Sequence, residues 1–381
     1  MTRQHVILET HPNAVGARGE GIAEDRRHRR VFVTGAIPGE RVVARVLAER
    51  PDYVRARVED VLAASPLRTG PPCPELDRGC GGCQWQHITV EGQRALKRDA
   101  IEQSLESLAH PPIRPTVVLP DTGYRTMLRA VVSGGRAGYR RARQHSLVPV
   151  ASCMVVPPLL EDLLVNGRYG EATEVILRCG AGTGDRLALP DPETATIDVP
   201  GGVRRDSIRE VAAGREWRIG AKSFFQSRPD GADALAQLVV AESGEPATAV
   251  DLYSGVGLFA GALGNAGWSL TAVEASAEAV ADARFNLPGT TVVQADVARW
   301  AATPADLAVA DPNRPGLGPE GVRAIAATGA RRVILVSCDV PALGRDARLL
   351  RRRGYTLSSV TPVDLFPHTF HIEAVSVFDA S

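Results

Sequence analysis

The second half of the chain alternates short apolar runs with helical stretches, and this alternation constrains the fold more than any other feature. From residue 216 onward, runs of strand length are separated by longer stretches with helical spacing: ATAVDLY, FAGALGNAG, SLTAVEAS, AEAVADARFNL, TVVQAD, DLAVADP, RRVILVSC and AVSVFDA. Strands that alternate with helices build a mainly parallel sheet covered by helices. The pattern therefore predicts an α/β, Rossmann-like domain over residues 216–381.

A glycine loop follows the first of these strands. It contains Gly255 and Gly257, and the residues before it include Asp251 and Tyr253. Glycines let a backbone turn sharply and approach a ligand closely. Glu274 ends the next strand, where a carboxylate can bind both ribose hydroxyls, and the following strand leads to an acid that can meet an adenine amino group, Asp296. The set predicts an adenosyl pocket; NAD binding or an ordinary turn are the alternatives.

Three further motifs follow strands of the same domain. They are DPNRPG at residues 311–316, the tripeptide Ser337-Cys338-Asp339, and FPHTFHIE at residues 366–373. Ligands of open α/β sheets bind outside the carboxyl ends of the strands, so these motifs can converge on the adenosyl pocket. A single cysteine after a buried strand is more often an inert core thiol, and histidines such as His368 and His371 are more often structural. The presence of the other motifs after strands of the same domain favours a reactive Cys338.

The first half of the chain predicts smaller units. Residues 1–63 alternate polar and apolar residues in short runs, which predicts a small antiparallel barrel of the OB type, with any small β-domain as the alternative. Residues 64–86 and 117–215 are expected to form a small α+β central domain. Residues 87–116 are expected to supply a helix that packs on the catalytic domain.

Six cysteines raise the question of disulfides or metal. Three of them, Cys73, Cys80 and Cys83, fall in a segment rich in proline and glycine, while Cys153, Cys179 and Cys338 are distant. A long chain without a signal-like start favours a reducing compartment, and hence metal binding or catalysis over disulfides. An iron–sulfur cluster and zinc are both compatible with such a loop. Cys179 lies in a strand-like run and is expected to be a buried bystander.

Composition places the protein in the cytoplasm rather than in a membrane. The chain has 381 residues, 44% of them hydrophobic, which is enough for two or three cores. No stretch approaches the roughly 20 apolar residues that a membrane span needs. The formal net charge is zero. Almost all the basic residues are arginines, and two clusters of them are candidates for contact with RNA phosphates: Arg26, Arg27, Arg29 and Arg30, and Arg136, Arg140, Arg141 and Arg143.

The ordered motifs resemble those of the RNA uracil-C5 methyltransferase family. The matching segments are SFFQ (residues 223–226), DLYSGVG, VEAS, DPNRPG, SCDVPALGRD and FPHTFHIE. The N-terminal segment is similar to a TRAM domain, an OB-like RNA-binding module. The set of Cys73, Cys80, Cys83 and Cys153 resembles the 4Fe–4S site of the family's 23S ribosomal RNA members. The resemblance covers nearly the whole chain and implies a class I methyltransferase fold for residues 216–381.

The resemblance also implies roles for individual residues. Cys338 is the nucleophile that adds to C6 of uracil, Glu373 is the base that removes the C5 proton, and Asp311 holds the uracil edge or the cofactor. Residues implied to bind S-adenosylmethionine are Gln226, Tyr253, Gly255, Gly257, Glu274, Asp296 and Asp311. The expected partner is RNA, 23S rRNA ahead of tRNA. No membrane and no obligate protein partner are expected.

Three sites depart from the family pattern, one of them by two residues. Asn313 replaces a proline, Asp339-Val340 replaces Asn-Pro, and Leu258 replaces an asparagine. A carboxylate at residue 339 opposes formation of the Cys338 thiolate through like-charge repulsion. Three functions therefore stay open: methylation of ribosomal RNA, the same chemistry on transfer RNA, and a non-catalytic RNA-binding or ribosome-assembly role.

Overall fold

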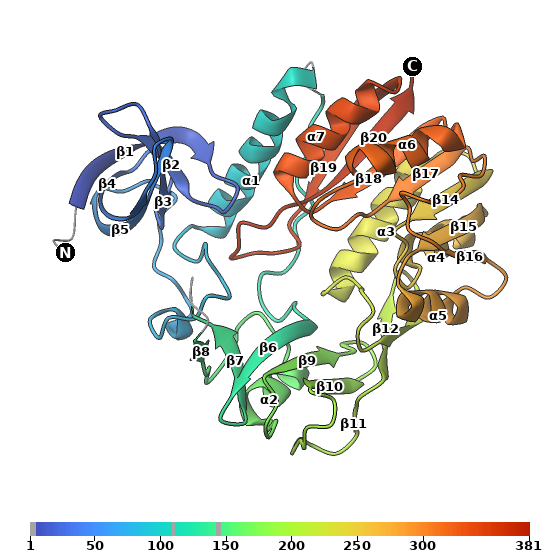
Figure 1. The fold of residues 1–381 in the computed structure, drawn as a ribbon, viewed down its shortest axis with the longest axis horizontal. Helices are drawn as coiled ribbons and strands as arrows, with labels where there is room; N and C mark the ends of the chain where they lie inside the picture. Colours follow the sequence, from blue (N-terminus) through green and yellow to red (C-terminus); the bar gives the residue numbers. More distant parts are fainter. Residues whose placement is uncertain (1–4, 109–110, 142–145) are drawn as a thin grey trace.

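A computed structural model describes residues 5–108, 111–141 and 146–381. Figure 1 shows a small barrel at one side, a mixed β domain below, and a larger α/β domain that contains the C-terminus. This arrangement places three bodies around a common centre. Within the described residues, no helix is both long and apolar enough to cross a membrane.

The N-terminal region forms the expected barrel. Five strands close on themselves in the order β1-β2-β3-β5-β4, and they are β1 (His5–Val15), β2 (Gly21–Glu24), β3 (Arg30–Thr34), β4 (Arg41–Glu49) and β5 (Tyr53–Ala63). Alternate residues such as Val31, Val33 and Val42 fill the interior. The barrel is not wholly antiparallel as predicted, because β3 pairs with β5 in parallel to close it.

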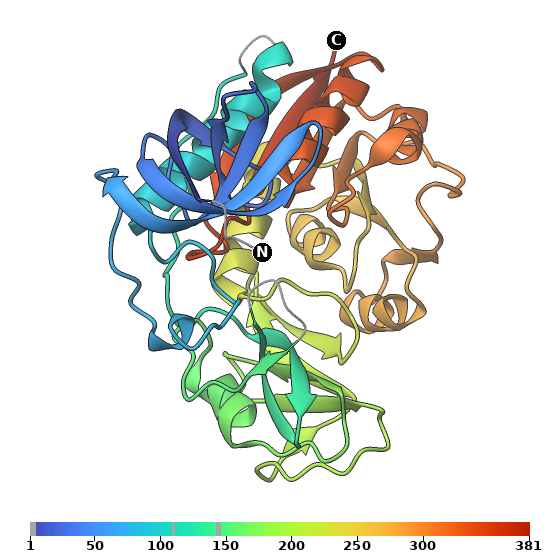
Figure 2. The same ribbon diagram turned by 60° about the vertical axis from the view of Figure 1, so that its left-hand side comes forward.

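A connecting segment joins the barrel to the other domains. It contains two short 3-10 helices, η1 (Pro74–Leu76) and η2 (Glu106–Leu108), and one long helix, α1 (Val90–Leu105). Thr89 caps α1 by accepting a hydrogen bond from the backbone N–H of Gly92. Figure 2 shows the barrel in front of α1. The helix lies against the C-terminal domain, with Ile101 and Leu105 in its core, as predicted.

The central domain is a six-stranded sheet with one helix. The strand order is β11-β10-β9-β6-β7-β8. The elements are β6 (Met127–Ser133), β7 (Arg136–Arg140), β8 (Leu147–Val148), α2 (Pro158–Asn166), β9 (Glu174–Cys179), β10 (Arg186–Asp191) and β11 (Val203–Arg204). The apolar face of α2, with Leu160, Leu163 and Leu164, packs in one core with Leu177 of β9.

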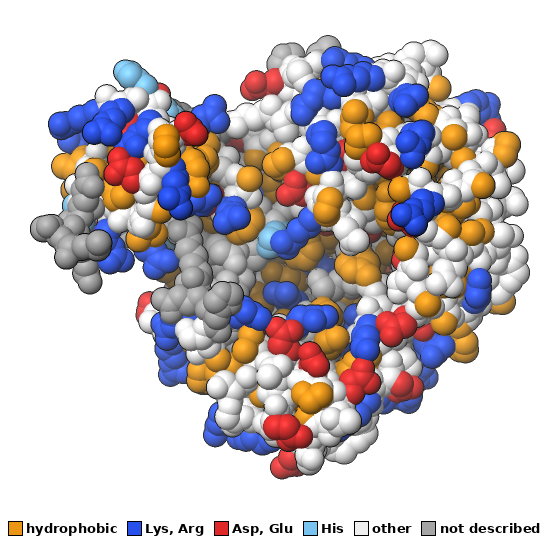
Figure 3. Space-filling view, viewed as in Figure 1, with side chains coloured by type: hydrophobic (Ala, Val, Ile, Leu, Met, Phe, Trp, Pro, Cys, Tyr) orange, Lys and Arg blue, Asp and Glu red, His pale blue; other side chains and the backbone are white. Residues whose placement is uncertain are grey.

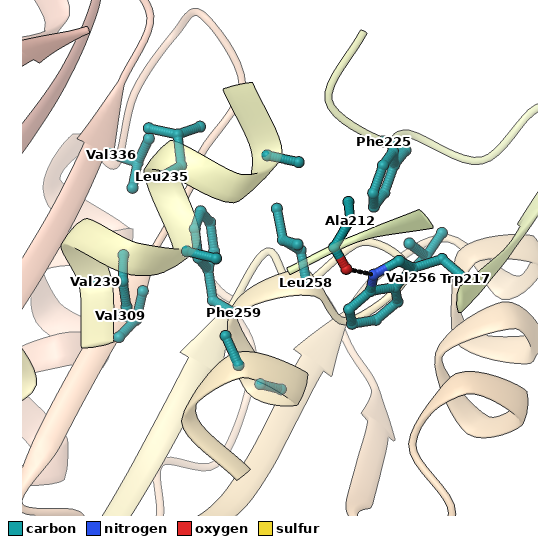
Figure 4. Packing of buried hydrophobic residues seen from close by; sticks show 14 of the residues in the cluster. Ala212, Trp217, Phe225, Leu235, Val239, Val256, Leu258, Phe259, Val309 and Val336 are labelled. Atoms are coloured by element: carbon teal, nitrogen blue, oxygen red, sulfur yellow. Dashed lines mark hydrogen bonds between the residues drawn. The ribbon is translucent and has the colours of Figure 1, made fainter. Parts of the chain in front are cut away.

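A two-stranded hairpin joins the central and C-terminal domains. It pairs β12 (Ser207–Ala212) with β13 (Arg215–Gly220). Trp217 is fully buried there, and its Nε1–H donates to the carbonyl oxygen of Ala212 at 2.8 Å, among residues of the C-terminal core (Figure 4). The domain boundary expected at residue 216 thus falls inside β13, since the hairpin packs as one unit.

The C-terminal domain is a seven-stranded sheet in the order β16-β15-β14-β17-β18-β20-β19. Its strands are β14 (Thr248–Leu252), β15 (Ser269–Glu274), β16 (Thr291–Gln294), β17 (Leu307–Ala310), β18 (Arg332–Ser337), β19 (Tyr355–Val363) and β20 (Glu373–Ala380). Strand β20 runs antiparallel to both of its neighbours, β18 and β19, and the other neighbouring pairs of the sheet are parallel. From β14 the chain continues to β15 on one side and later to β17 on the other, which opens a crevice at their carboxyl ends.

Helices cover both faces of this sheet. They are α3 (Pro229–Ser243), α4 (Leu258–Asn265), α5 (Ala277–Asn286), α6 (Gly318–Thr328) and α7 (Val340–Arg351). Successive residues of β18 serve opposite cores: Ile334 packs in the cluster of α3 and α4, and Val333 and Leu335 in that of α6, α7 and α1. A strand buried on both faces explains the continuous apolar run VILV.

Candidate active site

The glycine loop after β14 adopts a backbone shape that glycine favours. Gly255 has φ of 54° and Gly257 has φ of 100°, and Tyr253 between them and the strand also has a positive φ of 60°. Gly257 is the N-cap of α4. The loop therefore turns sharply from the sheet edge into the helix.

The two predicted glycines have different roles. Gly255 lines the large cavity described below, and a Cβ on it would meet only a backbone oxygen at 3.4 Å. Gly257 does not line that cavity, and a Cβ there would lie 2.4 Å from Cδ1 of Leu287. Gly257 allows the turn and the close packing of Leu287, whereas Gly255 faces the cavity in which a ligand would bind.

Two acids follow the strands beside the loop. Oε2 of Glu274, the last residue of β15, accepts the N–H of Gly255 at 2.9 Å, and its Oε1 accepts the N–H of Ser276 at 2.7 Å. Asp296 follows β16, and its Oδ1 accepts the N–H of Ala298 at 2.9 Å. These backbone bonds fix both carboxylates while leaving further lone pairs for a ligand.

Asp311 and Gln226 meet at the next strand end. Asp311 follows β17, and Nε2 of Gln226 donates to its Oδ2 at 3.1 Å. Gln226 comes from the segment before α3, so this bond joins the SFFQ segment to the DPNRPG motif. Burial raises the pKa of Asp311 to about 7.

Cys338 directly follows β18, and Glu373 is the first residue of the neighbouring strand, β20. Ser337, the last residue of β18, pairs with Ala374 in antiparallel register, so Cys338 and Glu373 both lie at this end of the two strands. Glu373 is only 3% exposed, and its Oε1 has no hydrogen-bond partner within the described part of the chain. Burial, with the charge of Asp311 second, raises the pKa of Glu373 well above its usual value.

Cys338 is half-buried and carries a weakly acidic thiol. Burial first, and then the charges of Glu373 and Asp311, raise its pKa to about 12, while Arg314 acts in the opposite direction. Asp339 adds a smaller effect of the same sign. Without a ligand, the thiol is therefore neutral and lies beside acidic groups. A bound cation would favour the charged forms of the thiol and of these carboxyl groups.

One cavity of about 660 Å³ unites these side chains. It is lined by every predicted catalytic and cofactor residue except Gly257, namely Gln226, Tyr253, Gly255, Glu274, Asp296, Asp311, Cys338 and Glu373. His371 also lines it, whereas His368 is buried with both ring nitrogens unpartnered among the described residues. Figure 3 shows a hollow where the three bodies meet, with Lys and Arg side chains at its rim.

The cavity includes cations that the sequence analysis did not single out. Arg125, Lys222 and Arg314 line it, from the segment before β6, the segment after β13 and the DPNRPG motif respectively. Only Arg314 had a signal in the sequence, because it lies within a motif. Arg125 and Lys222 are brought to the cavity by the tertiary fold alone.

The four predicted cysteine ligands surround one small cavity. Cys73, Cys80, Cys83 and Cys153 all line it, and the hydroxyl of Tyr139 lies 3.2 Å from Sγ of Cys153. Burial raises the pKa of Cys83 to about 12. Over the described residues, no group of three or more His, Cys, Asp or Glu is spaced to hold a metal ion directly. Cys179 is buried in β9, as predicted.

The two arginine clusters differ in their surroundings. In the barrel, Arg29 is bound by Asp25 and Glu49, while Arg26 and Arg30 are exposed. In the second cluster, the residue after β7, Arg141, pairs with Cys80 in an isolated bridge. The remaining member, at position 143, lies outside the described residues. The second cluster therefore adjoins the cysteine cavity.

Comparison with known proteins connects these features to a family. The chain is 35% identical to an uncharacterized RNA methyltransferase of Streptomyces avermitilis over 98% of its own length and 97% of that protein's, and 34% identical to one of Streptomyces coelicolor, with 98% and 92% covered. The crystal structure of a Pyrococcus abyssi tRNA (uracil-54, C5)-methyltransferase with S-adenosyl-L-homocysteine matches with a TM-score of 0.74 and 21% identity, covering 99% of this chain and 100% of that one. No family model matches the sequence.

Proposed function

Because the chain belongs to the RNA methyltransferase family, as its motifs predicted, we propose that it methylates C5 of a uridine in RNA with S-adenosylmethionine. The observation that carries this proposal is that Cys338 and Glu373 line the same cavity as Gly255 of the glycine loop. A nucleophile, a proton acceptor and a cofactor loop around one cavity are what transfer to a pyrimidine carbon requires.

The cavity suits a cationic methyl donor. Asp311 and Glu373 both line it, and Oε1 of Glu373 is buried without a partner among the described residues. S-adenosylmethionine supplies an electrophilic methyl group on a positively charged sulfur, and that charge complements these carboxyl groups.

The chain offers a complete set of contacts for the cofactor. Glu274 would accept both ribose hydroxyls, and Asp296 would accept the adenine amino group. Tyr253 and Gly255 would line the adenosine, while Gln226 and Asp311 would hold the methionine end or the uracil edge. Their backbone bonds hold the carboxylates in place before the ligand binds, which reduces the cost of ordering them.

Cys338 starts the proposed reaction. Its thiolate adds to C6 of uracil, and the electrons of the C5–C6 double bond move onto the O4 carbonyl as an enolate. C5 then bonds to the methyl group of S-adenosylmethionine while the bond from that methyl group to the sulfonium sulfur breaks, so that S-adenosylhomocysteine would leave. Glu373 takes the C5 proton, the double bond reforms, and the bond between C6 and the Cys338 sulfur breaks. The thiolate is released, so the enzyme returns to its starting state once Glu373 loses its proton to solvent.

The departures at 339 and 313 do not remove the machinery. Oδ1 of Asp339 accepts the N–H of Ala342 at 2.9 Å and caps α7, a structural task that an acid performs as well as an amide. Asn313 lines the cavity beside Arg314. Leu258 is buried at the start of α4, so it contributes to packing rather than to a polar contact. These positions therefore adjust the rate more than the reaction type.

The four-cysteine set supports a 4Fe–4S cluster as a structural cofactor. Four cysteines that line one cavity would supply one thiolate to each of the four irons of such a cluster. Gly82 and Arg125 line both this cavity and the catalytic one. Anaerobically purified protein is expected to contain about four irons and four sulfides per chain, and Cys153→Ser is expected to lose them. One bound zinc instead would contradict the assignment.

The second part of the proposal is the identity of the target RNA. The barrel and the cysteine segment favoured 23S rRNA, with the barrel as a TRAM-like RNA-binding module. The structure of the Pyrococcus abyssi tRNA enzyme matches over the whole chain, however, so the barrel alone does not separate the two targets. We retain 23S rRNA as the first candidate and tRNA as the second. Mapping 5-methyluridine in both RNAs from cells that lack the protein distinguishes them.

Covalent trapping tests the chemistry directly. RNA with 5-fluorouridine at the mapped position cannot lose fluorine as a cation, so the adduct on Cys338 is expected to persist with cofactor present. Wild-type protein is expected to give a band that survives denaturation, and Cys338→Ala is expected to give none. Absence of an adduct and of labelled methyl transfer from wild type would favour the non-catalytic alternative.

A further inference from the structure

A second groove of about 290 Å³ lies between the barrel and the C-terminal domain. It shares only Cys338 and His371 with the catalytic cavity, so these two side chains form the wall between the two spaces. The remaining lining comes from the end of β1 and the loop after it, Trp85, α1, the first turn of α7, and residues 370–372. The groove therefore opens directly beside the proposed nucleophile.

The groove has an aromatic side. Phe370 is half-buried, and its ring lies 4.5 Å from that of His371, measured between centroids. Trp85 is 3% exposed, and its Nε1–H already donates to the carbonyl oxygen of Gly19 at 2.9 Å. Burial, with Arg314 second, lowers the pKa of His371 to about 4, so its ring is neutral near pH 7. Uncharged aromatic rings beside a catalytic cavity are typical stacking surfaces for unpaired bases.

The opposite side of the groove is polar and acidic. Asp339 uses Oδ1 to cap α7, and its Oδ2 makes no hydrogen bond within the described ranges. Gln103 and Ser104 of α1 line the same space. A free carboxylate oxygen accepts the amino groups of adenine, cytosine or guanine and repels phosphate. Uracil has no amino group, and its single N3–H lies between two carbonyl oxygens that repel a carboxylate. The groove thus suits a base edge better than an RNA backbone.

We propose that this groove holds a nucleotide that neighbours the target uridine, with its base against Phe370 and its amino group on Asp339. The inference rests on the proposed function, because the occupant is tethered to the uridine that reacts with Cys338. Tethering supplies the occupant at a high effective concentration, and the space has room for one nucleoside but not for a duplex. Asp339 thereby becomes a specificity residue that selects against uridine at the neighbouring position.

The test uses the full chain and the RNA fragment in which 5-methyluridine has been mapped. Each flanking nucleotide is replaced in turn by an abasic site, and RNA binding is measured by fluorescence anisotropy with wild type and with Phe370→Leu, which keeps an apolar side chain. We expect each of the two changes, Phe370→Leu and the abasic site at one position, to weaken binding about tenfold, as loss of base stacking does. When Phe370→Leu and this abasic site are combined, binding is expected to be no weaker than with either change alone.

A second variant keeps the proposal testable if Phe370→Leu folds poorly. Asp339→Asn retains the helix cap and adds an amide donor, so it is expected to accept uracil at the same flanking position about as well as the native base. Phe285→Leu, an exposed phenylalanine on α5, is the matched control and is expected to change nothing. If the losses of RNA affinity caused by Phe370→Leu and by the abasic site multiply at every flanking position, the proposal is overturned. Failure of methyl transfer to any RNA would instead overturn the function, since anisotropy does not depend on catalysis.

Discussion

Nζ of Lys97 donates to Oδ1 of Asp364 at 2.9 Å, and this buried bond joins α1 to the segment that carries the proposed base. Lys97 also donates to the carbonyl oxygen of Phe366 at 3.0 Å, and Nε of Arg94 binds Oδ2 of Asp364 at 2.8 Å. His368 follows in the same segment, and its backbone N–H donates to Oε1 of Gln93 at 2.6 Å. Helix α1 thus holds the loop that leads into Glu373.

Lys97→Met is expected to destabilise the protein by about 3–5 kcal/mol, because it leaves a buried carboxylate with one partner fewer. Thermal unfolding with and without the substitution measures the loss. Lys222→Met is the matched control: this lysine is exposed, so the loss of its ion pair with Glu193 is expected to change stability far less. Equal effects of the two substitutions would show that α1 does not hold the loop through Lys97.

Alkylation of Cys338 is expected to be slow at neutral pH and to rise about tenfold per pH unit between pH 7 and 10. The reason is that only the thiolate reacts, and the pKa of the ligand-free thiol is raised to about 12. Iodoacetamide labelling followed by peptide mass spectrometry measures the rate at this cysteine alone. A rate that levels off below pH 9 would show that the thiol is more acidic than its surroundings dictate.

Asp339→Asn is expected to raise the alkylation rate of Cys338 at fixed pH by roughly two- to fivefold, since the neighbouring negative charge raises the thiol pKa. Asparagine keeps the helix cap, so stability should hold. Asp339→Ala removes both charge and cap, and it should cost about 1 kcal/mol of stability in addition. Identical alkylation rates for the wild type and the asparagine variant would show that Asp339 does not reach the sulfur electrostatically.

Glu373→Gln is expected to stop the reaction after methyl transfer, because the C5 proton then has no acceptor and Cys338 cannot leave. Turnover should fall by about 10²- to 10⁴-fold, and methylated RNA should remain attached to the protein on a denaturing gel. Cys338→Ala supplies the control without an attached RNA. Normal turnover of the glutamine variant would assign proton removal to another group of the cavity.

Gly257→Ala is expected to lower the free energy of unfolding by about 1–3 kcal/mol, because its φ of 100° disfavours a side chain and the new Cβ would clash with Leu287. Gly264→Ala on the same helix meets no atom within 4 Å. That variant should stabilise the helix by up to about 1 kcal/mol. Chemical denaturation of both variants provides the comparison.

The sequence predicted the parts of the site that depend on local pattern. Acids after apolar strands fell at one edge of the sheet, because parallel strands present their carboxyl ends together, and Glu274 and Asp296 are there. Motif spacing did not distinguish Gly255, which lines the cavity, from Gly257, which packs on Leu287. That difference depends on a side chain thirty residues downstream, which no local pattern encodes.

Other features depend on contacts between distant segments. The family resemblance predicted an RNA methyltransferase, and the curated relatives confirm it. The parallel pairing of β3 with β5 was missed, because an alternating pattern gives strand positions but not the partner that closes a barrel. Arg125 was missed for a similar reason: nothing near it in the sequence marks it, although it lines two cavities.

The insertion of β20 between β18 and β19 has a consequence for the order of assembly during synthesis. The barrel draws only on the first 63 residues and can close while the ribosome is still translating. The sheet of the C-terminal domain cannot be completed until the end of synthesis, because β20, which begins at Glu373, lies between β18 and β19. A nascent chain that stalls before this point would carry a folded barrel beside a sheet with an unpaired, apolar strand edge, and chaperones are expected to bind that species.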